Sequence, residues 1–134
     1  MGTEGTAFHK WSPMENLDIG YDVDQIAWGT EGLVFTLIPD GPRKKQSNQK
    51  LRLIWDWSHV ISYHVTDETY RADCWGLDFE NDGRFYASKE SEYLTRFREK
   101  SPLFPDDAIH FTLVGTNMVV DILAKEYPAA ELEM

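Results

Sequence analysis

Two short segments with alternating side chains constrain the fold of this 134-residue chain most. They read IHFTLVG at 109–115 and MVVDILA at 118–124, and a two-residue loop at 116–117 would join them into an antiparallel hairpin. This loop pairs residue 113 with 120 and residue 111 with 122. One face of the hairpin is then entirely apolar, which supports the register because both strands agree on it. Those apolar residues are Ile109, Phe111, Leu113, Val120 and Ile122, and the opposite face carries His110, Thr112 and Asp121.

Other segments also alternate as strands do. We predict strands in VDQIAW, LVFTLI, LRLIWDW, HVISYHV, YRADCW and RFYA, at 23–28, 33–38, 51–57, 59–65, 70–75 and 84–87. GTEG at 29–32 predicts a turn between the first two of these strands. The alternation places Trp55 and Trp57 together on the core face of their strand, and it places Ile61, Tyr63 and Val65 together on one face of theirs.

One segment has the pattern of a helix. In SEYLTRFREKSP, 91–102, Ser91 is placed to cap the helix and Pro102 to end it. An apolar stripe lies at Tyr93, Leu94 and Phe97. The sequence therefore predicts an α+β fold, mostly antiparallel β-sheet with one main helix near residues 91–100. We expect a single domain over 1–134, with a mobile polar loop at about 40–50.

The net charge of −10 narrows the classes of partner. Nucleic acids and anionic membranes bind basic surfaces, so this charge argues against both and favours a cationic partner. The basic stretch RKKQSNQKLR, 43–52, could dock against acids of the same chain or bind an acidic patch of a partner. Cys74 is the one cysteine, which excludes an internal disulfide and fits a cytoplasmic location. The N-terminal segment lacks the apolar core of a signal peptide.

The stretch GLDFENDGRF, 76–85, resembles the start of a calcium-binding loop, with Asp78, Glu80 and Asp82 at alternate positions. A calcium loop of that type needs a carboxylate at its twelfth position, which Lys89 occupies here. We therefore interpret the stretch as a turn between two strands. It leaves an acidic patch close to Trp75.

The histidines offer no local metal-binding or catalytic spacing, and we predict neither a metal nor a cofactor. His110 and Asp121 are diagonal neighbours in the predicted hairpin, close enough for a hydrogen bond. They could form a structural polar pair, or a base and the group that orients it. No serine in a nucleophile elbow accompanies them.

The C-terminal half, SEYLTRFREKS followed by IHFTLVGTNMVVDILAKEYP, resembles the end of small bacterial proteins found with polymorphic toxins and regarded as immunity proteins. The resemblance covers about residues 84–128. It implies a protein that inhibits a toxin, and it assigns no functional residue. An acidic face would suit such an inhibitor, because many toxin domains are nucleases with basic clefts.

We therefore expect an acidic, non-enzymatic, cytoplasmic binding protein of immunity type that inhibits a basic, nuclease-like toxin. The alternative is a small enzyme or ligand-binding domain with a pocket around His110 and Asp121. The residues expected to bind the partner are Asp78, Glu80, Asp82 and Trp75, followed by Asp106 and Asp107.

Overall fold

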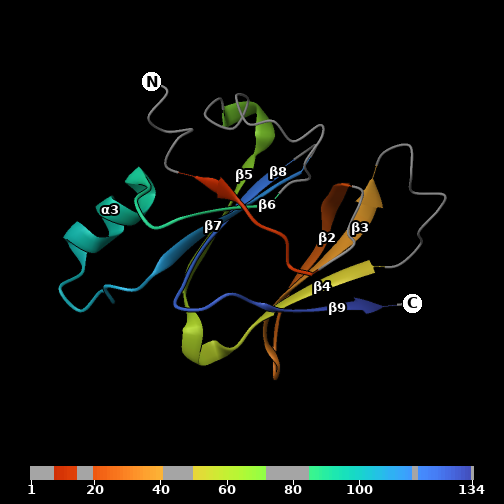
Figure 1. Ribbon diagram of the computed structural model, residues 1–134, viewed down its shortest axis with the longest axis horizontal. Coiled ribbons are helices and arrows are strands. Elements are labelled where there is room, and N and C mark those ends of the chain that lie inside the picture. The colour runs from red at the N-terminus through yellow and green to blue at the C-terminus, as the bar shows by residue number, and fades with distance from the viewer. Residues whose placement is uncertain (1–7, 15–19, 41–49, 72–84, 116–117, 134) are drawn as a thin grey trace.

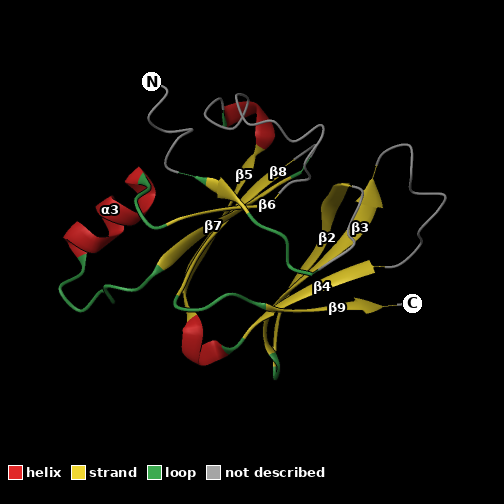
Figure 2. Ribbon diagram, in the orientation of Figure 1, coloured by secondary structure: helices red, strands yellow, loops and turns green. Residues whose placement is uncertain are grey.

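The computed structural model of this chain describes residues 8–14, 20–40, 50–71, 85–115 and 118–133. Within them, two antiparallel sheets account for most of the structure (Figures 1 and 2). The five-stranded sheet has the order β1 (His9–Lys10), β6 (Phe85–Ser88), β7 (Ile109–Val114), β8 (Met118–Ala124) and β5 (Val60–Asp67). The four-stranded sheet has the order β2 (Gly20–Gly29), β3 (Gly32–Asp40), β4 (Lys50–Trp55) and β9 (Ala129–Glu133).

The described residues also contain one α-helix, α3 (Glu92–Lys100), and two 3-10 helices, η2 (Trp57–His59) and η3 (Glu68–Tyr70). The predicted fold class, mostly antiparallel sheet with one main helix, is confirmed. No helix in the described ranges combines the length and apolar character needed to cross a membrane.

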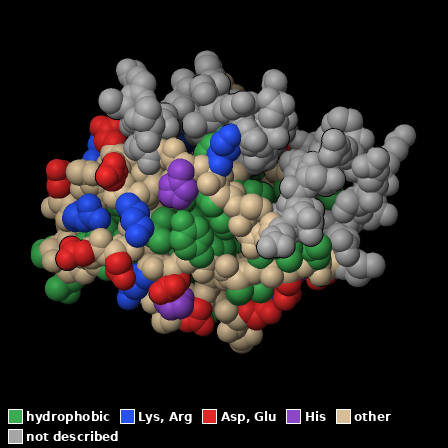
Figure 3. All heavy atoms as spheres, viewed as in Figure 1, with side chains coloured by type: hydrophobic (Ala, Val, Ile, Leu, Met, Phe, Trp, Pro, Cys, Tyr) green, Lys and Arg blue, Asp and Glu red, His purple; other side chains and the backbone are tan. Residues whose placement is uncertain are grey.

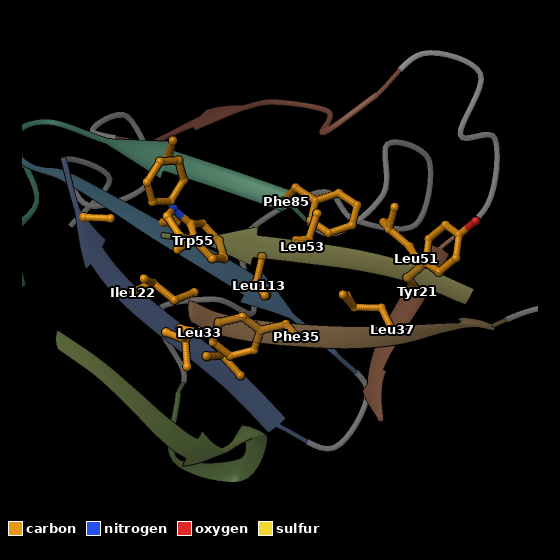
Figure 4. Close-up of a cluster of buried hydrophobic side chains, with 14 of the residues drawn as sticks. Tyr21, Leu33, Phe35, Leu37, Leu51, Leu53, Trp55, Phe85, Leu113 and Ile122 are labelled. Atoms are coloured by element: carbon orange, nitrogen blue, oxygen red, sulfur yellow. The ribbon is translucent and has the colours of Figure 1, made fainter. Parts of the chain in front are cut away.

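The main core lies between the two sheets, and Figure 4 shows its side chains filling that space. Strands of both sheets contribute fully buried residues, among them Phe35, Leu53 and Trp55 from one sheet and Phe111 and Ile122 from the other. Burying a side chain of this size contributes about 1.5–3 kcal/mol.

The hairpin of β7 and β8 has the register that the sequence predicts. Leu113 is paired with Val120, and Phe111 with Ile122. The backbone N–H of Gly115 donates to the carbonyl of Met118 over 2.9 Å, at the point where the turn begins. All five residues of the predicted apolar face belong to the main core.

Two predictions about strand faces are wrong. Trp57 is not in the core but 41% exposed, because β4 ends at Trp55 and Asp56 caps η2. A bulge between Val60 and Ser62 also interrupts β5. Ile61 therefore packs against the cluster beneath α3, on the opposite face from Tyr63, which packs against the main core. Val65 follows Tyr63 beyond the bulge and is 44% exposed.

The segment 70–75, predicted as a strand, is described only at its start. Tyr70 ends η3 and is 79% exposed, so the prediction fails at this residue. Residues 72–75, including Cys74, lie outside the described residues, as do 41–49 of the predicted polar loop.

The turn between β2 and β3 depends on Gly32. Its φ of +126° is one that residues with a side chain rarely adopt. A Cβ at this position would lie 2.2 Å from the carbonyl oxygen of Trp55. Gly32 therefore lets β3 pass close to the end of β4.

The sequence did not predict β1 or β9. β9 pairs with β4, and Arg52 on β4 joins the two strands through an ion pair with Glu131. Arg52 also pairs with Glu31 of the β2–β3 turn, at 2.6 Å. This residue of the basic stretch thus docks against acids of its own chain.

The helix α3 begins as the sequence predicts, with the hydroxyl of Ser91 accepting the N–H of Leu94 over 3.1 Å. Leu94 is fully buried with Ala108 and Leu123, and Tyr93 and Phe97 pack beside them. Leu123 alternates with the core residue Ile122, so α3 covers the outer face of the five-stranded sheet. The helix thereby brings its first residues close to the polar face of the β7–β8 hairpin.

Candidate functional site

A pocket of about 270 Å³ lies on the outer face of the five-stranded sheet, beside the start of α3. It combines residues that are far apart in the sequence. The N-terminal segment contributes an aromatic ring, β5 a histidine, and the residue after η3 an arginine. The lining includes Phe8, His64, Arg71, Ser91, His110 and Asp121.

A chain of hydrogen bonds forms one wall of this pocket. The hydroxyl of Ser91 lies 2.6 Å from His110 Nδ1, and His110 Nε2 lies 2.6 Å from Asp121 Oδ1. Thr112 also donates to Asp121 Oδ1 over 3.0 Å, and Arg71 forms an ion pair with Oδ2. The pairing of His110 with Asp121 that the sequence predicts is therefore present.

The donors and acceptors of this chain follow from its chemistry. An ionised carboxylate can only accept, so the proton of His110 lies on Nε2, toward Asp121. Nδ1 then accepts from the Ser91 hydroxyl, whose oxygen accepts from the N–H of Leu94. Every group from the helix start to the buried carboxylate thus has a partner.

Asp121 is ionised within this arrangement. Burial by itself would raise the pKa of Asp121, whereas the hydrogen bond from His110 and the charge and hydrogen bond of Arg71 lower it. The pKa of Asp121 therefore lies below its ordinary value of 3.8. Removing one partner of such a buried ion pair destabilises a fold strongly, because an uncompensated charge is left behind.

Ser91, His110 and Asp121 are bonded in the same order as the groups of a hydrolytic triad, but the surroundings of Ser91 differ from those of a nucleophilic serine. The Ser91 hydroxyl also caps α3, and the residue is only 3% exposed. Its backbone angles, φ −68° and ψ 157°, are those of ordinary extended chain rather than a strained elbow. The arrangement suits a polar tie between helix and sheet, with one side open to the pocket.

The role of Ser91 beside His110 was missed by sequence reasoning, although Ser91 was predicted as a cap. The two residues are 19 positions apart, and the packing of α3 on the sheet brings them together. Arg71 was missed for the same reason. No local spacing in the sequence signals either contact.

Only two of the six residues predicted to bind a partner lie within the described residues. Asp106 and Asp107 are exposed in the turn between α3 and β7. Asp78, Glu80, Asp82 and Trp75 lie outside the described residues, so the acidic patch stays a prediction. Across the described ranges, no group of three or more His, Cys, Asp or Glu side chains could hold a metal ion.

Comparisons of the chain with protein-family models, with curated proteins and with solved structures gave no match. Any function proposed for this chain therefore depends on the chemistry and geometry of its own residues.

Proposed function

We propose that this chain is an acidic, non-enzymatic binding protein of immunity type that inhibits a basic, nuclease-like toxin in the cytoplasm. The observation that carries the proposal is the charge of the surface. Among the described residues, twelve aspartates and glutamates are exposed, against six lysines and arginines. The whole chain carries a net charge of −10.

The placement of two arginines increases this excess of negative charge at the surface. Arg52 and Arg71 are only 18% and 16% exposed at their side chains, and both are engaged by carboxylates. On the face seen in Figure 3, acidic side chains are spread over the left side and the lower edge, and lysines and arginines lie among them on the left.

An acidic surface of this strength has a clear physical effect. It repels nucleic acids and attracts basic proteins, and such steering raises association rates by about 10- to 1000-fold at low salt. The resemblance of residues 84–128 to immunity proteins supports the same function. The internal pairing of His110 and Asp121 is compatible with a non-enzymatic protein, because a structural role accounts for that pair without catalysis.

The proposal can be tested by capture. The purified chain is immobilised and exposed to lysate and secreted fraction from its source cells, at low and then moderate salt, and retained proteins are identified by mass spectrometry. We expect one basic protein in a stoichiometric amount, released as salt rises, whose toxic or nuclease activity the chain suppresses in a purified mixture.

Charge reversal provides the matched variants. Changing Asp78, Glu80 and Asp82 to lysine should slow association with that protein and reduce its salt dependence, and Asp106→Lys with Asp107→Lys tests the second predicted patch. Absence of a basic partner under both salt conditions would count against the proposed function.

A second candidate function is a small enzyme or ligand-binding domain. It is favoured by one observation, that the pocket beside α3 holds Ser91, His110 and Asp121 together. Labelling of Ser91 by a fluorophosphonate probe, abolished by His110→Ala in a folded variant, would support this function. Absence of labelling in the wild-type chain would argue against a serine hydrolase.

A further inference from the structure

Two tryptophans are stacked on each other at the protein surface. Trp28 is the second-last residue of β2 and Trp57 begins η2, and they are 51% and 41% exposed. Their ring centroids are 4.1 Å apart and the rings are within 4° of parallel. Tyr63 of β5 lies beside Trp28, at 5.4 Å between ring centroids. We call Trp28, Trp57 and Tyr63 the aromatic platform.

The polar groups of the platform are bonded within the chain. The indole N–H of Trp28 donates to the Tyr63 hydroxyl over 3.0 Å, and that of Trp57 donates to the carbonyl of Gly29 over 2.9 Å. The tryptophans therefore present mainly aromatic surface to solvent. Because these bonds and the stacking fix both side chains, a ligand would bind the platform without ordering it first.

Negative charge is fixed next to the platform. Asp56 directly precedes Trp57, and its carboxylate accepts hydrogen bonds from the hydroxyl and the backbone N–H of Ser58. These two bonds lower the pKa of Asp56, so the carboxylate is ionised at neutral pH. Glu31, in the turn that follows Trp28 and Gly29, is already paired with Arg52, so Asp56 is the carboxylate on which this charge depends.

The platform has the chemistry that a cation requires. The face of an indole ring attracts a positive charge, and arginine stacks on it particularly well because its guanidinium group is planar. Among the described residues, a cation–aromatic contact is present between Arg98 and Phe104, at 5.5 Å from the ring centroid, and it lies outside the platform. Neither Trp28 nor Trp57 makes a cation–aromatic contact with a lysine or arginine of the described residues.

We propose that the aromatic platform binds an arginine side chain of the basic partner, with the guanidinium group stacked on Trp57 and paired with Asp56. This inference rests on the proposed function, because it takes the partner to be a basic protein. It adds the position of the contact and the type of residue bound. Long-range attraction by the acidic surface and short-range contact at the platform are then separate contributions.

The test uses a fluorescein-labelled hexa-arginine peptide and fluorescence anisotropy at several salt concentrations. We compare the wild-type chain with Trp57→Ala and Asp56→Asn. Tyr70→Ala is the matched control, because Tyr70 is 79% exposed and lies outside the platform. We expect Trp57→Ala and Asp56→Asn each to weaken binding about two- to fivefold, and Tyr70→Ala to leave it unchanged.

A second measurement does not depend on the folding of any variant. In the ¹⁵N-labelled wild-type chain, the indole N–H resonances of Trp28 and Trp57 should shift on addition of the peptide, ahead of the resonance of Trp55 in the core. Hexa-lysine should bind more weakly than hexa-arginine at the same salt, because a lysine ammonium stacks less well.

The outcomes separate this inference from the proposed function. Peptide binding that is sensitive to salt but equal in wild type, Trp57→Ala and Asp56→Asn overturns the platform as the binding site and leaves the proposed function standing. Tryptophan shifts caused by cellohexaose or by self-association, but not by hexa-arginine, overturn the choice of arginine. If the capture experiment retains no basic protein, that result counts against the proposed function and not against binding of arginine at the platform.

Discussion

Replacing Asp121 by asparagine should destabilise the protein strongly. The carboxylate is 6% exposed, accepts from His110 and Thr112 at one oxygen, and pairs with Arg71 at the other. Asparagine keeps the size and one acceptor, but places an amide group where the charged oxygen faced Arg71. Breaking a buried ion pair by changing one partner costs about 3–5 kcal/mol. Because the Arg71 side chain is 16% exposed, we expect the lower end, about 3 kcal/mol.

Urea unfolding at pH 7, followed by circular dichroism, measures this change. A loss of about 3 kcal/mol is a large share of the roughly 5–15 kcal/mol that stabilises a typical domain. It should lower the melting temperature by about 10 °C for a chain of this size. Asp107→Asn is the matched control, because Asp107 is exposed, and it should change stability by less than about 0.5 kcal/mol.

The pH dependence gives a further check on the same variant. The folded-state pKa of Asp121 lies below its unfolded value, so its contribution is present above about pH 4 and is lost as the pH falls through the folded pKa. The difference between wild type and Asp121→Asn should therefore shrink as the pH falls below about 4. A difference at pH 7 no larger than that of Asp107→Asn would refute the view that this carboxylate holds the network together.

Two other predictions test local features of the fold. Gly32→Ala should cost more than about 1 kcal/mol and Gly29→Ala much less, because a Cβ at Gly32 meets the Trp55 carbonyl whereas one at Gly29 meets open space; equal urea midpoints would contradict this. Ser91→Ala should cost about 1–2 kcal/mol through loss of the cap and of the bond to His110. Ser91→Thr should recover part of that loss in thermal melts, since threonine also caps helices.

The alternation and spacing of apolar residues were sufficient to predict the β7–β8 hairpin and the start of α3. The register of β7 with β8 follows from two strands that agree on one apolar face. The start of α3 follows from a serine cap before an apolar stripe. Prediction from the pattern failed where a single residue interrupts a strand. Asp56 caps η2 and ends the alternation of β4, so Trp57 lies at the surface.

The candidate site was predictable only where it lies within the hairpin. His110 and Asp121 were paired correctly because both belong to adjacent strands. Ser91 and Arg71 reach them through the packing of α3 and of the segment after η3, which no spacing in the sequence encodes. The stacking of Trp28 on Trp57 likewise depends on the contact between η2 and the end of β2.

The double role of Ser91 has a consequence for the motions of the protein. First-turn amides of a helix usually exchange their hydrogens quickly, because helix ends fray easily. Here the N–H of Leu94 is bonded to an oxygen that is itself held by His110 of the central strand β7. Fraying of α3 from its first turn must therefore break a contact with the buried sheet. The start of this helix should exchange as part of the same cooperative unit as β7, rather than as an independent surface segment.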